Sequence, residues 1–438
     1  MFTVFVDRFY ICLYIPANEK LSIDIQLNMT TDKNMAIPQT LTAQKRIESI
    51  DIIRGLAMVI MALDHVRDYF HLTANIDDPL NLATTTPLLY ATRWITHFCA
   101  PVFVFLSGTS IYLQSLRKTK KELSSFLIKR GLWLIFAEFF IISLAWTFDP
   151  LYHIHPMQVI WAIGISMVVL GLMILARFPY KLILGLGLII VFGHNLLDIP
   201  ESASGFKPGF WWDLLHSGYF KLYPYAPNRY FMMVYPFLAW TGVMMLGYCA
   251  GVFFSSKYTE EKRRKTIQWL GLGLILLFVV VRFINIYGDP VAWSTQKNGV
   301  YTFLSFIKVQ KYPPSLMYLC ITIGPALLLL AYMEKIKNRF TNIMIIFGRT
   351  AFFYYILHLY LIHLLAMIAF FIRGGHTLED AMNSMKNLPF LFVIPGEGYN
   401  LAVVYGVWAA VILSLYPLCK WYDKYKTSHK EKWWLSYL

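Results

Sequence analysis

The residues best suited to do chemistry lie in one apolar stretch, IDIIRGLAMVIMALDHVRDYFH, at positions 50–71. The stretch has the apolar content of a membrane-spanning helix, yet it contains the ionisable residues Asp51, Arg54, Asp64, His65 and Asp68. A charged side chain held inside a bilayer costs roughly 2.5 to 3.5 kcal/mol on insertion scales. Because of this cost, such residues usually mark a functional site rather than simple packing.

The spacing within this stretch predicts how its polar groups are arranged. Arg54 and His65 are eleven residues apart, and at about 100° per residue a helix returns almost to the same face after three turns, ~16 Å along its axis. One helix face should therefore carry a cation near one membrane surface and an imidazole nearer the other.

An imidazole beside carboxylates is suited to general base catalysis. We expect His65 to be the base, with Asp64 or Asp68 orienting its ring. The alternative is that a neighbouring helix satisfies His65 and that its role is structural.

Further polar residues lie in or near other apolar segments and suggest a polar cavity. The residues expected to line it are Asp51, His97, His194, Arg349 and His358. Each could instead be an ordinary interfacial or packing residue. No HExxH or HxxxH spacing appears, so the sequence predicts no metal site.

Composition indicates a membrane protein of the all-α class. Hydrophobic residues make up 57% of the chain and charged residues only 15%, whereas soluble domains are about 25% charged. Ten apolar runs are long enough to cross a bilayer, near residues 50–70, 92–114, 128–148, 156–176, 180–198, 230–254, 266–287, 314–334, 343–372 and 399–421. The run 343–372 is long enough to be tilted or broken.

The distribution of basic residues predicts the orientation. The net charge of +14 comes largely from clusters in alternate loops and at the C-terminus. This is the positive-inside pattern and argues against nucleic-acid binding. Both termini should be cytoplasmic. The less basic loops should lie outside, at 72–91, 149–155, 199–229, 288–313 and 373–398.

The chain divides into three parts. Residues 1–44 are expected to form a disordered tail, residues 45–425 a transmembrane domain, and residues 426–438 a basic C-terminal tail. The predicted location is the inner, cytoplasmic membrane, crossed many times.

Three segments resemble a known family: IDIIRGLAMVIMALDH, GRTAFFYYILH and the closing YPLCKWYDKYK…WWLSYL. Over about residues 45–438 the chain is similar to bacterial members of the heparan-alpha-glucosaminide N-acetyltransferase catalytic-domain family, within the wider group of transmembrane acyltransferases. That wider group carries an arginine, ten residues and then a histidine in its first helix. Arg54 and His65 match this pattern.

The resemblance implies transfer of an acetyl group across a membrane. Acetyl-CoA would be the co-substrate on the cytoplasmic side, and an amine or hydroxyl of a sugar or glycan would be the acceptor on the other. Arg54 would help to bind acetyl-CoA, since a guanidinium suits phosphate geometry. The lysosomal enzyme's proposed active histidine lies in the first luminal loop, where the nearest residue here is His71. The base is therefore His65 or, as the alternative, His71.

Two other functions remain open at this point. The chain could be a permease or exporter without chemistry, in which buried charges line a transport path. It could also be an acyltransferase that uses another acyl-CoA donor. The expected partners are the lipid bilayer, acyl-CoA and the acceptor, with a homo-oligomer left open.

Overall fold

Long apolar helices make up most of the chain in the computed structural model, which describes residues 46–385 and 388–436. The unit considered below begins at Ile47. Predictions for the tail of residues 1–44 lie outside the described residues. Among the described residues, seven helical segments are long and apolar enough to cross a membrane: Pro87–Ser115, Tyr180–Glu201, Phe237–Phe254, Glu260–Ile284, Leu316–Met333, Ala351–Ile372 and Leu401–Ser428.

Three more helical segments coincide with the other predicted spans. Helix α2 (Glu48–Phe70) is long enough but rich in charges. The segment Lys120–Thr147 joins α5, the π-helix η2 and α6, and α7 (Val159–Leu175) has 17 residues. The helical class is thus confirmed, whereas ten crossings and the location of the termini stay predictions.

Besides α2 and α7, the following helices make up these segments or connect them. The helices are α3 (Pro87–Ile95), η1 (Thr96–Phe98), α4 (Cys99–Ser115), α5 (Lys120–Ala137), η2 (Glu138–Ile142), α6 (Ser143–Thr147), α8 (Tyr180–Gly193), η3 (His194–Leu197), α9 (Asp198–Glu201), α10 (Phe210–Trp212), η4 (Asp213–Ser217), α11 (Phe237–Ala250), η5 (Gly251–Phe254), α12 (Glu260–Ile284), α13 (Gly299–Ile307), α14 (Leu316–Met333), α15 (Arg339–Arg349), α16 (Ala351–Ile372), α17 (Leu378–Ser384), α18 (Leu401–Ser428) and η6 (Trp433–Ser436). The strands are β1 (Ile154–Met157), β2 (Lys221–Ala226) and β3 (Arg229–Met233). They form one sheet of order β1-β3-β2, in which β1 is parallel and β2 antiparallel to β3.

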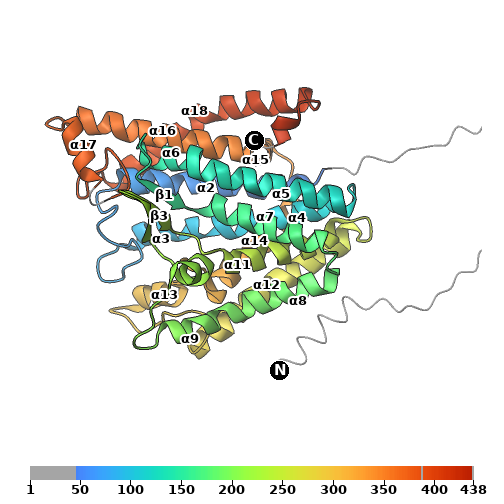
Figure 1. The fold of residues 1–438 in the computed structure, drawn as a ribbon. Helices are drawn as coiled ribbons and strands as arrows, with labels where there is room; N and C mark the ends of the chain where they lie inside the picture. Colours follow the sequence, from blue (N-terminus) through green and yellow to red (C-terminus); the bar gives the residue numbers. More distant parts are fainter. Residues whose placement is uncertain (1–45, 386–387, 437–438) are drawn as a thin grey trace, which may run out of the picture. The chain divides into compact units, whose positions relative to one another are not determined.

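The long helices lie side by side, and the short elements gather at one end of them (Figure 1). The sheet, α3, α9, α13 and α17 all lie at this end, and they belong to or adjoin the five loops predicted to be outside. The less basic loops, which alternate with basic loops along the sequence, therefore lie together at one end of the helical unit (Figure 1). The run 343–372, which was expected to be tilted or broken, is broken in the structure, since α15 ends at Arg349 and α16 begins at Ala351.

Helix α2 is central to this unit. It packs against α4, α14, α15, α16 and α18, and most of its residues are buried. Acidic residues in its first turn, Glu48 and Asp51, suit the positive end of the helix dipole. Apart from the exposed Glu48, its charged residues are thus buried or half-buried among other helices.

Several peripheral helices instead expose apolar side chains. Ile189 of α8, Leu276 of α12 and Leu413 of α18 are 69%, 64% and 72% exposed. Large apolar side chains on the outside of a helical unit are unfavourable in water but suit contact with lipid tails. The packing therefore agrees with a membrane protein.

Two glycines allow α2 and α15 to touch through their backbones. A Cβ atom on Gly55 would lie 1.9 Å from the carbonyl oxygen of Met344, and one on Gly348 would lie 1.9 Å from that of Asp51. Neither backbone oxygen can move away as a flexible side chain could. The approach therefore requires glycine at both positions.

We predict that Gly55→Ala lowers the thermal unfolding temperature of the detergent-solubilised protein. Forcing the two helices apart should cost about 1–3 kcal/mol or more. Gly185→Ala in α8 is the matched control, because a Cβ there meets nothing within 4 Å, and alanine is the better helix former by about 1 kcal/mol. Equal melting temperatures for both variants would contradict the close contact.

Candidate functional site

A hydrogen bond between two buried histidines joins α2 to α16. Nδ1 of His65 lies 2.7 Å from Nε2 of His358, and Nδ1 of His358 lies 3.0 Å from the backbone oxygen of Tyr354. A carbonyl oxygen only accepts, so Nδ1 of His358 carries the proton and Nε2 of a neutral His358 is an acceptor. Nδ1 of His65 must then donate, which leaves the lone pair on Nε2 of His65.

That lone pair is the basic atom of the pair. Among the described residues, Nε2 of His65 makes no hydrogen bond, although the side chain is only 9% exposed. The backbone oxygen of Tyr354 accepts from His358, and Nε2 of His358 accepts from His65. These two hydrogen bonds together fix the tautomer of both rings. The pair can therefore take one proton at a defined atom.

Aromatic rings hold the two imidazoles in place. Trp146 meets the His65 ring edge-on at 4.8 Å between ring centres, and Tyr354 stacks on His358 at 5.1 Å. The ring centre of Tyr355 lies 6.4 Å from that of His65. These contacts exclude water from one side of the pair and restrict ring rotation.

The predicted carboxylates do not contact this pair; they bind cations instead. Asp64 accepts from Arg67 at 2.8 Å and from Arg93 at 3.1 Å, and Nζ of Lys311 lies 3.8 Å from it. Asp68 accepts from Arg67 at 2.6 Å. The structure thus replaces the expected contact of Asp64 or Asp68 with the His65 ring by one from His358.

This cluster of Asp64, Asp68, Arg67, Arg93 and Lys311 has three cations and two carboxylates. Lys311 is 9% exposed and Arg67 is 4% exposed, and Nε of Arg67 has no hydrogen-bond partner among the described residues. The cluster therefore has one positive charge in excess next to the histidine pair. Such a charge is suited to stabilising an anion that forms beside His65.

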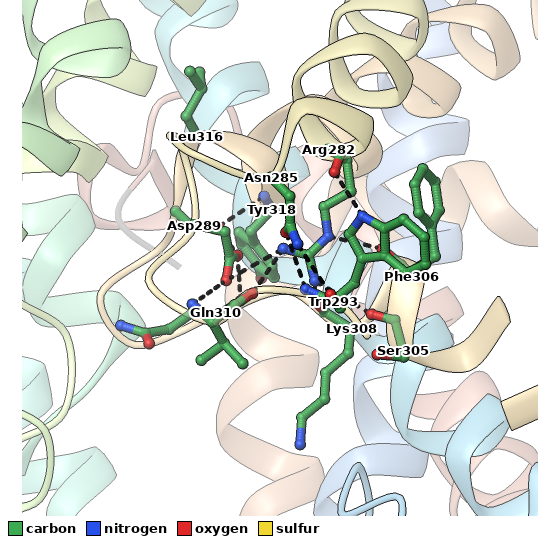
Figure 2. A network of polar contacts seen from close by, with 12 residues as sticks. Arg282, Asn285, Asp289, Trp293, Ser305, Phe306, Lys308, Gln310, Leu316 and Tyr318 are labelled. Carbon is green, nitrogen blue, oxygen red and sulfur yellow. Dashed lines mark hydrogen bonds and ion pairs between the residues drawn. The ribbon is translucent and has the colours of Figure 1, made fainter. Parts of the chain in front are cut away.

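A second buried network holds the loop that delivers Lys311. Figure 2 shows the guanidinium of Arg282 directed into the loop between α12 and α14. It donates hydrogen bonds to four backbone carbonyl oxygens, those of Val291, Ser305, Phe306 and Lys308. Asp289 accepts from the N–H of Gln310 and from the hydroxyl of Ser315, at 2.9 and 2.6 Å. The chain is thereby held just before Lys311, at Lys308 and Gln310, and just after it, at Ser315.

His97 lies beside the same cluster, one turn after Arg93. It is 1% exposed, and neither ring nitrogen has a hydrogen-bond partner within the described part of the chain. Its ring centre is 5.3 Å from that of Tyr318, whose hydroxyl donates to the His97 backbone oxygen at 2.8 Å. His97 is thus a buried polar group close to the cations of the site.

His71, the alternative base, follows the end of α2. Its Nδ1 interacts with Thr73 in the same turn, and the adjoining backbone pairs with Tyr399. Burial, and then the nearby Arg67 charge, lower the pKa of His71. Its interactions are local, and the structure gives it no partner equivalent to His358 among the described residues.

The other predicted site residues lie in two further places. Arg54 donates to the backbone oxygen of Leu106 at 2.9 Å and to Ser110 at 2.6 Å, at the opposite end of α2 from His65. Arg349 pairs with Asp423 at 3.0 Å. The buried Asp51 belongs to the Arg54 end of α2.

His194 also lies elsewhere, in η3, where its ring centre is 5.7 Å from that of His216. The predicted single cavity is therefore divided. His358 contacts His65 and His97 lies beside the cations that bind Asp64, whereas Asp51, Arg349 and His194 do not join them.

Sequence reasoning missed Arg67, Arg93 and Lys311. The two arginines carry a recognisable signal, because each lies in or at the start of an apolar helix. Lys311 lies in a long loop and has no such signal, since only the folded loop brings it to Asp64.

These features define a helical membrane protein with a buried, positively charged histidine site. The family model described as heparan-alpha-glucosaminide N-acetyltransferase, catalytic, matches residues 46–286, and the chain belongs to this family. It is therefore a membrane acetyltransferase. No curated protein matches the chain as a relative.

We predict that Asp64→Asn destabilises the protein strongly, by about 3–5 kcal/mol, because it leaves buried cations without their counter-ion. Glu48→Gln is the control, since Glu48 forms an exposed pair with Lys337 at 3.8 Å that should contribute no more than about 1 kcal/mol. Thermal unfolding in detergent measures both. Similar losses in the two variants would refute a structural role for the buried cluster.

Proposed function

We propose that the chain transfers an acetyl group from acetyl-CoA to an amine or hydroxyl of a sugar or glycan, with His65 as the general base. The observation that carries this proposal is the histidine pair, which leaves a defined lone pair on Nε2 of His65. His358 takes the orienting role that the sequence had assigned to Asp64 or Asp68. The two carboxylates instead hold the cations of the site.

In the proposed reaction, Nε2 of His65 removes a proton from the acceptor as its nitrogen or oxygen attacks the thioester carbonyl carbon. The carbonyl oxygen becomes an oxyanion, which the excess positive charge of Arg67, Arg93 and Lys311 stabilises. The C–S bond then breaks, and the sulfur of CoA leaves and receives the proton. Transfer through an acetyl-histidine would use the same lone pair of His65, so the geometry serves both routes.

The proposed donor enters from the end of α2 that carries Arg54. The guanidinium of Arg54 is suited to binding the phosphates of such a donor. The donor is proposed to be acetyl-CoA because the family transfers acetyl groups.

We propose a ten-span topology in the cytoplasmic membrane, with both termini in the cytoplasm. The seven apolar segments, together with α2, Lys120–Thr147 and α7, make up this number. The gathering of the five less basic loops at one end supports it (Figure 1). Donor and acceptor would then reach the site from opposite sides.

We predict that His65→Ala lowers the rate of acceptor-dependent CoA release by at least about 10²-fold, since it removes the general base. His358→Gln should retain more activity than His358→Leu, because the amide oxygen of glutamine can still accept from Nδ1 of His65 whereas leucine cannot. The assay follows CoA release from acetyl-CoA with glucosamine or another sugar as acceptor.

His71→Ala is the matched comparison, and its rate of CoA release should remain close to that of the unaltered protein. Loss of activity in His71→Ala with retention in His65→Ala would place the base in the loop. Sugar flux through vesicles without CoA release would favour a permease. Faster CoA release from a different acyl-CoA than from acetyl-CoA would identify that acyl-CoA as the donor.

The proposed sidedness predicts which exposed residues a membrane-impermeant thiol reagent reaches. Ser256 and Ser204 are exposed, the first next to η5 and the second after α9. In a background without native cysteines, Ser256→Cys should react only from the cytoplasm and Ser204→Cys only from outside. Labelling of both positions from one side of sealed vesicles would exclude transfer across the membrane.

A further inference from the structure

A separate polar cluster lies at the end of the helical run that continues from α8 through η3 into α9. His194, Asp198 and Glu201 follow one another at spacings of four and three residues, which places them on one face of a helix. His216, from the π-helix η4, lies against this face. Ligand-type atoms of Asp198, Glu201 and His216 all lie within 4.8 Å of one another.

The hydrogen bonds of His216 determine which nitrogen carries its proton. Its Nδ1 lies 2.7 Å from Oε1 of Glu201, which also accepts from the indole N–H of Trp212 at 2.6 Å. A carboxylate only accepts, so Nδ1 of His216 donates. A neutral His216 then carries its lone pair on Nε2.

That second nitrogen is buried and points toward a carboxylate without bonding to it. His216 is 1% exposed, and its Nε2 has no hydrogen-bond partner among the described residues. Oδ1 of Asp198 lies 3.8 Å away, which is too long for a hydrogen bond. The other oxygen of Asp198 already accepts from Asn195 at 2.8 Å.

His194 provides an independent observation at the same place. It is 3% exposed, both of its ring nitrogens lack a hydrogen-bond partner in the described part of the chain, and its ring centre is 5.7 Å from that of His216. Burying polar groups without partners is costly. Two such imidazoles next to a carboxylate are the donor set that a divalent metal ion satisfies.

We propose that Nε2 of His216, Oδ1 of Asp198 and the imidazole of His194 bind a divalent transition-metal ion, Zn²⁺ by its preference for these ligands. Tetrahedral zinc with bonds near 2.0–2.1 Å needs ligand atoms about 3.3 Å apart. The 3.8 Å between Nε2 of His216 and Oδ1 of Asp198 is close to this distance, whereas the ring of His194, whose centre lies 5.7 Å from that of His216, would have to turn toward the ion. Glu201 holds the far nitrogen of His216, as second carboxylates commonly do for ligating histidines.

The ion would tie two separate segments together. Asn195, next to His194, accepts from the backbone N–H of Leu316 at 2.8 Å, so the cluster also adjoins the start of α14. The metal would thus join the run of η3 and α9 to η4, next to this helix end. This role is structural and does not depend on the proposed acyl transfer.

The test is the metal content of the purified full-length protein. After incubation with ZnCl₂ and removal of unbound metal by gel filtration, mass spectrometry should find about one zinc per chain. His216→Gln and Asp198→Asn should each lose most of it. Co²⁺ in place of zinc should give the visible absorption of a tetrahedral site in the unaltered protein but not in His216→Gln or Asp198→Asn.

His376→Gln is the matched control. His376 pairs with Glu397 at 2.7 Å but has no third metal-ligating residue beside it among the described residues, so this variant should keep its zinc. Asp198→Asn preserves side-chain shape and tests the site even where His216→Gln fails to fold. Absence of zinc from the unaltered protein, or full retention by Asp198→Asn, would overturn the proposal.

Discussion

The structure depends on one constraint: charged groups of α2 must be neutralised inside a bundle of apolar helices. Asp64 meets this constraint by binding Arg67 of its own helix, Arg93 of α3 and Lys311 of a distant loop. Each ion left unpaired in such surroundings would cost several kcal/mol. The arrangement of the loops around α2 therefore follows from the charges that α2 carries.

The same constraint connects the fold to the proposed chemistry. Lys311 can lie beside Asp64 only because Arg282 and Asp289 order the loop between α12 and α14 (Figure 2). The family match ends at residue 286, so His358 and Lys311 come from the part of the chain beyond it. The histidine pair and the excess positive charge thus combine residues from both parts.

Several features could be read from the sequence. Helical class and the polar face of α2 follow from local hydrophobicity and helical periodicity, which act over a few turns. The length of the run 343–372 left a tilt or a break open, and the structure shows the break. The proposed role of His65 also has a local signal, because an imidazole in an apolar helix is rare. The sequence could not identify its partner, since histidines satisfy their hydrogen bonds through whatever residue the fold brings close.

By itself, the sequence thus determined the apolar helices, the alternation of basic loops and the position of the polar residues along α2. Only the tertiary structure decided that Asp64 binds cations, that His358 contacts His65, and that His194 belongs to a different cluster with His216. The physical reason is the distance along the chain over which each kind of interaction acts. Periodicity and hydrophobicity are properties of neighbouring residues, whereas the hydrogen bond between His65 and His358, 293 positions apart, depends on how the helices pack.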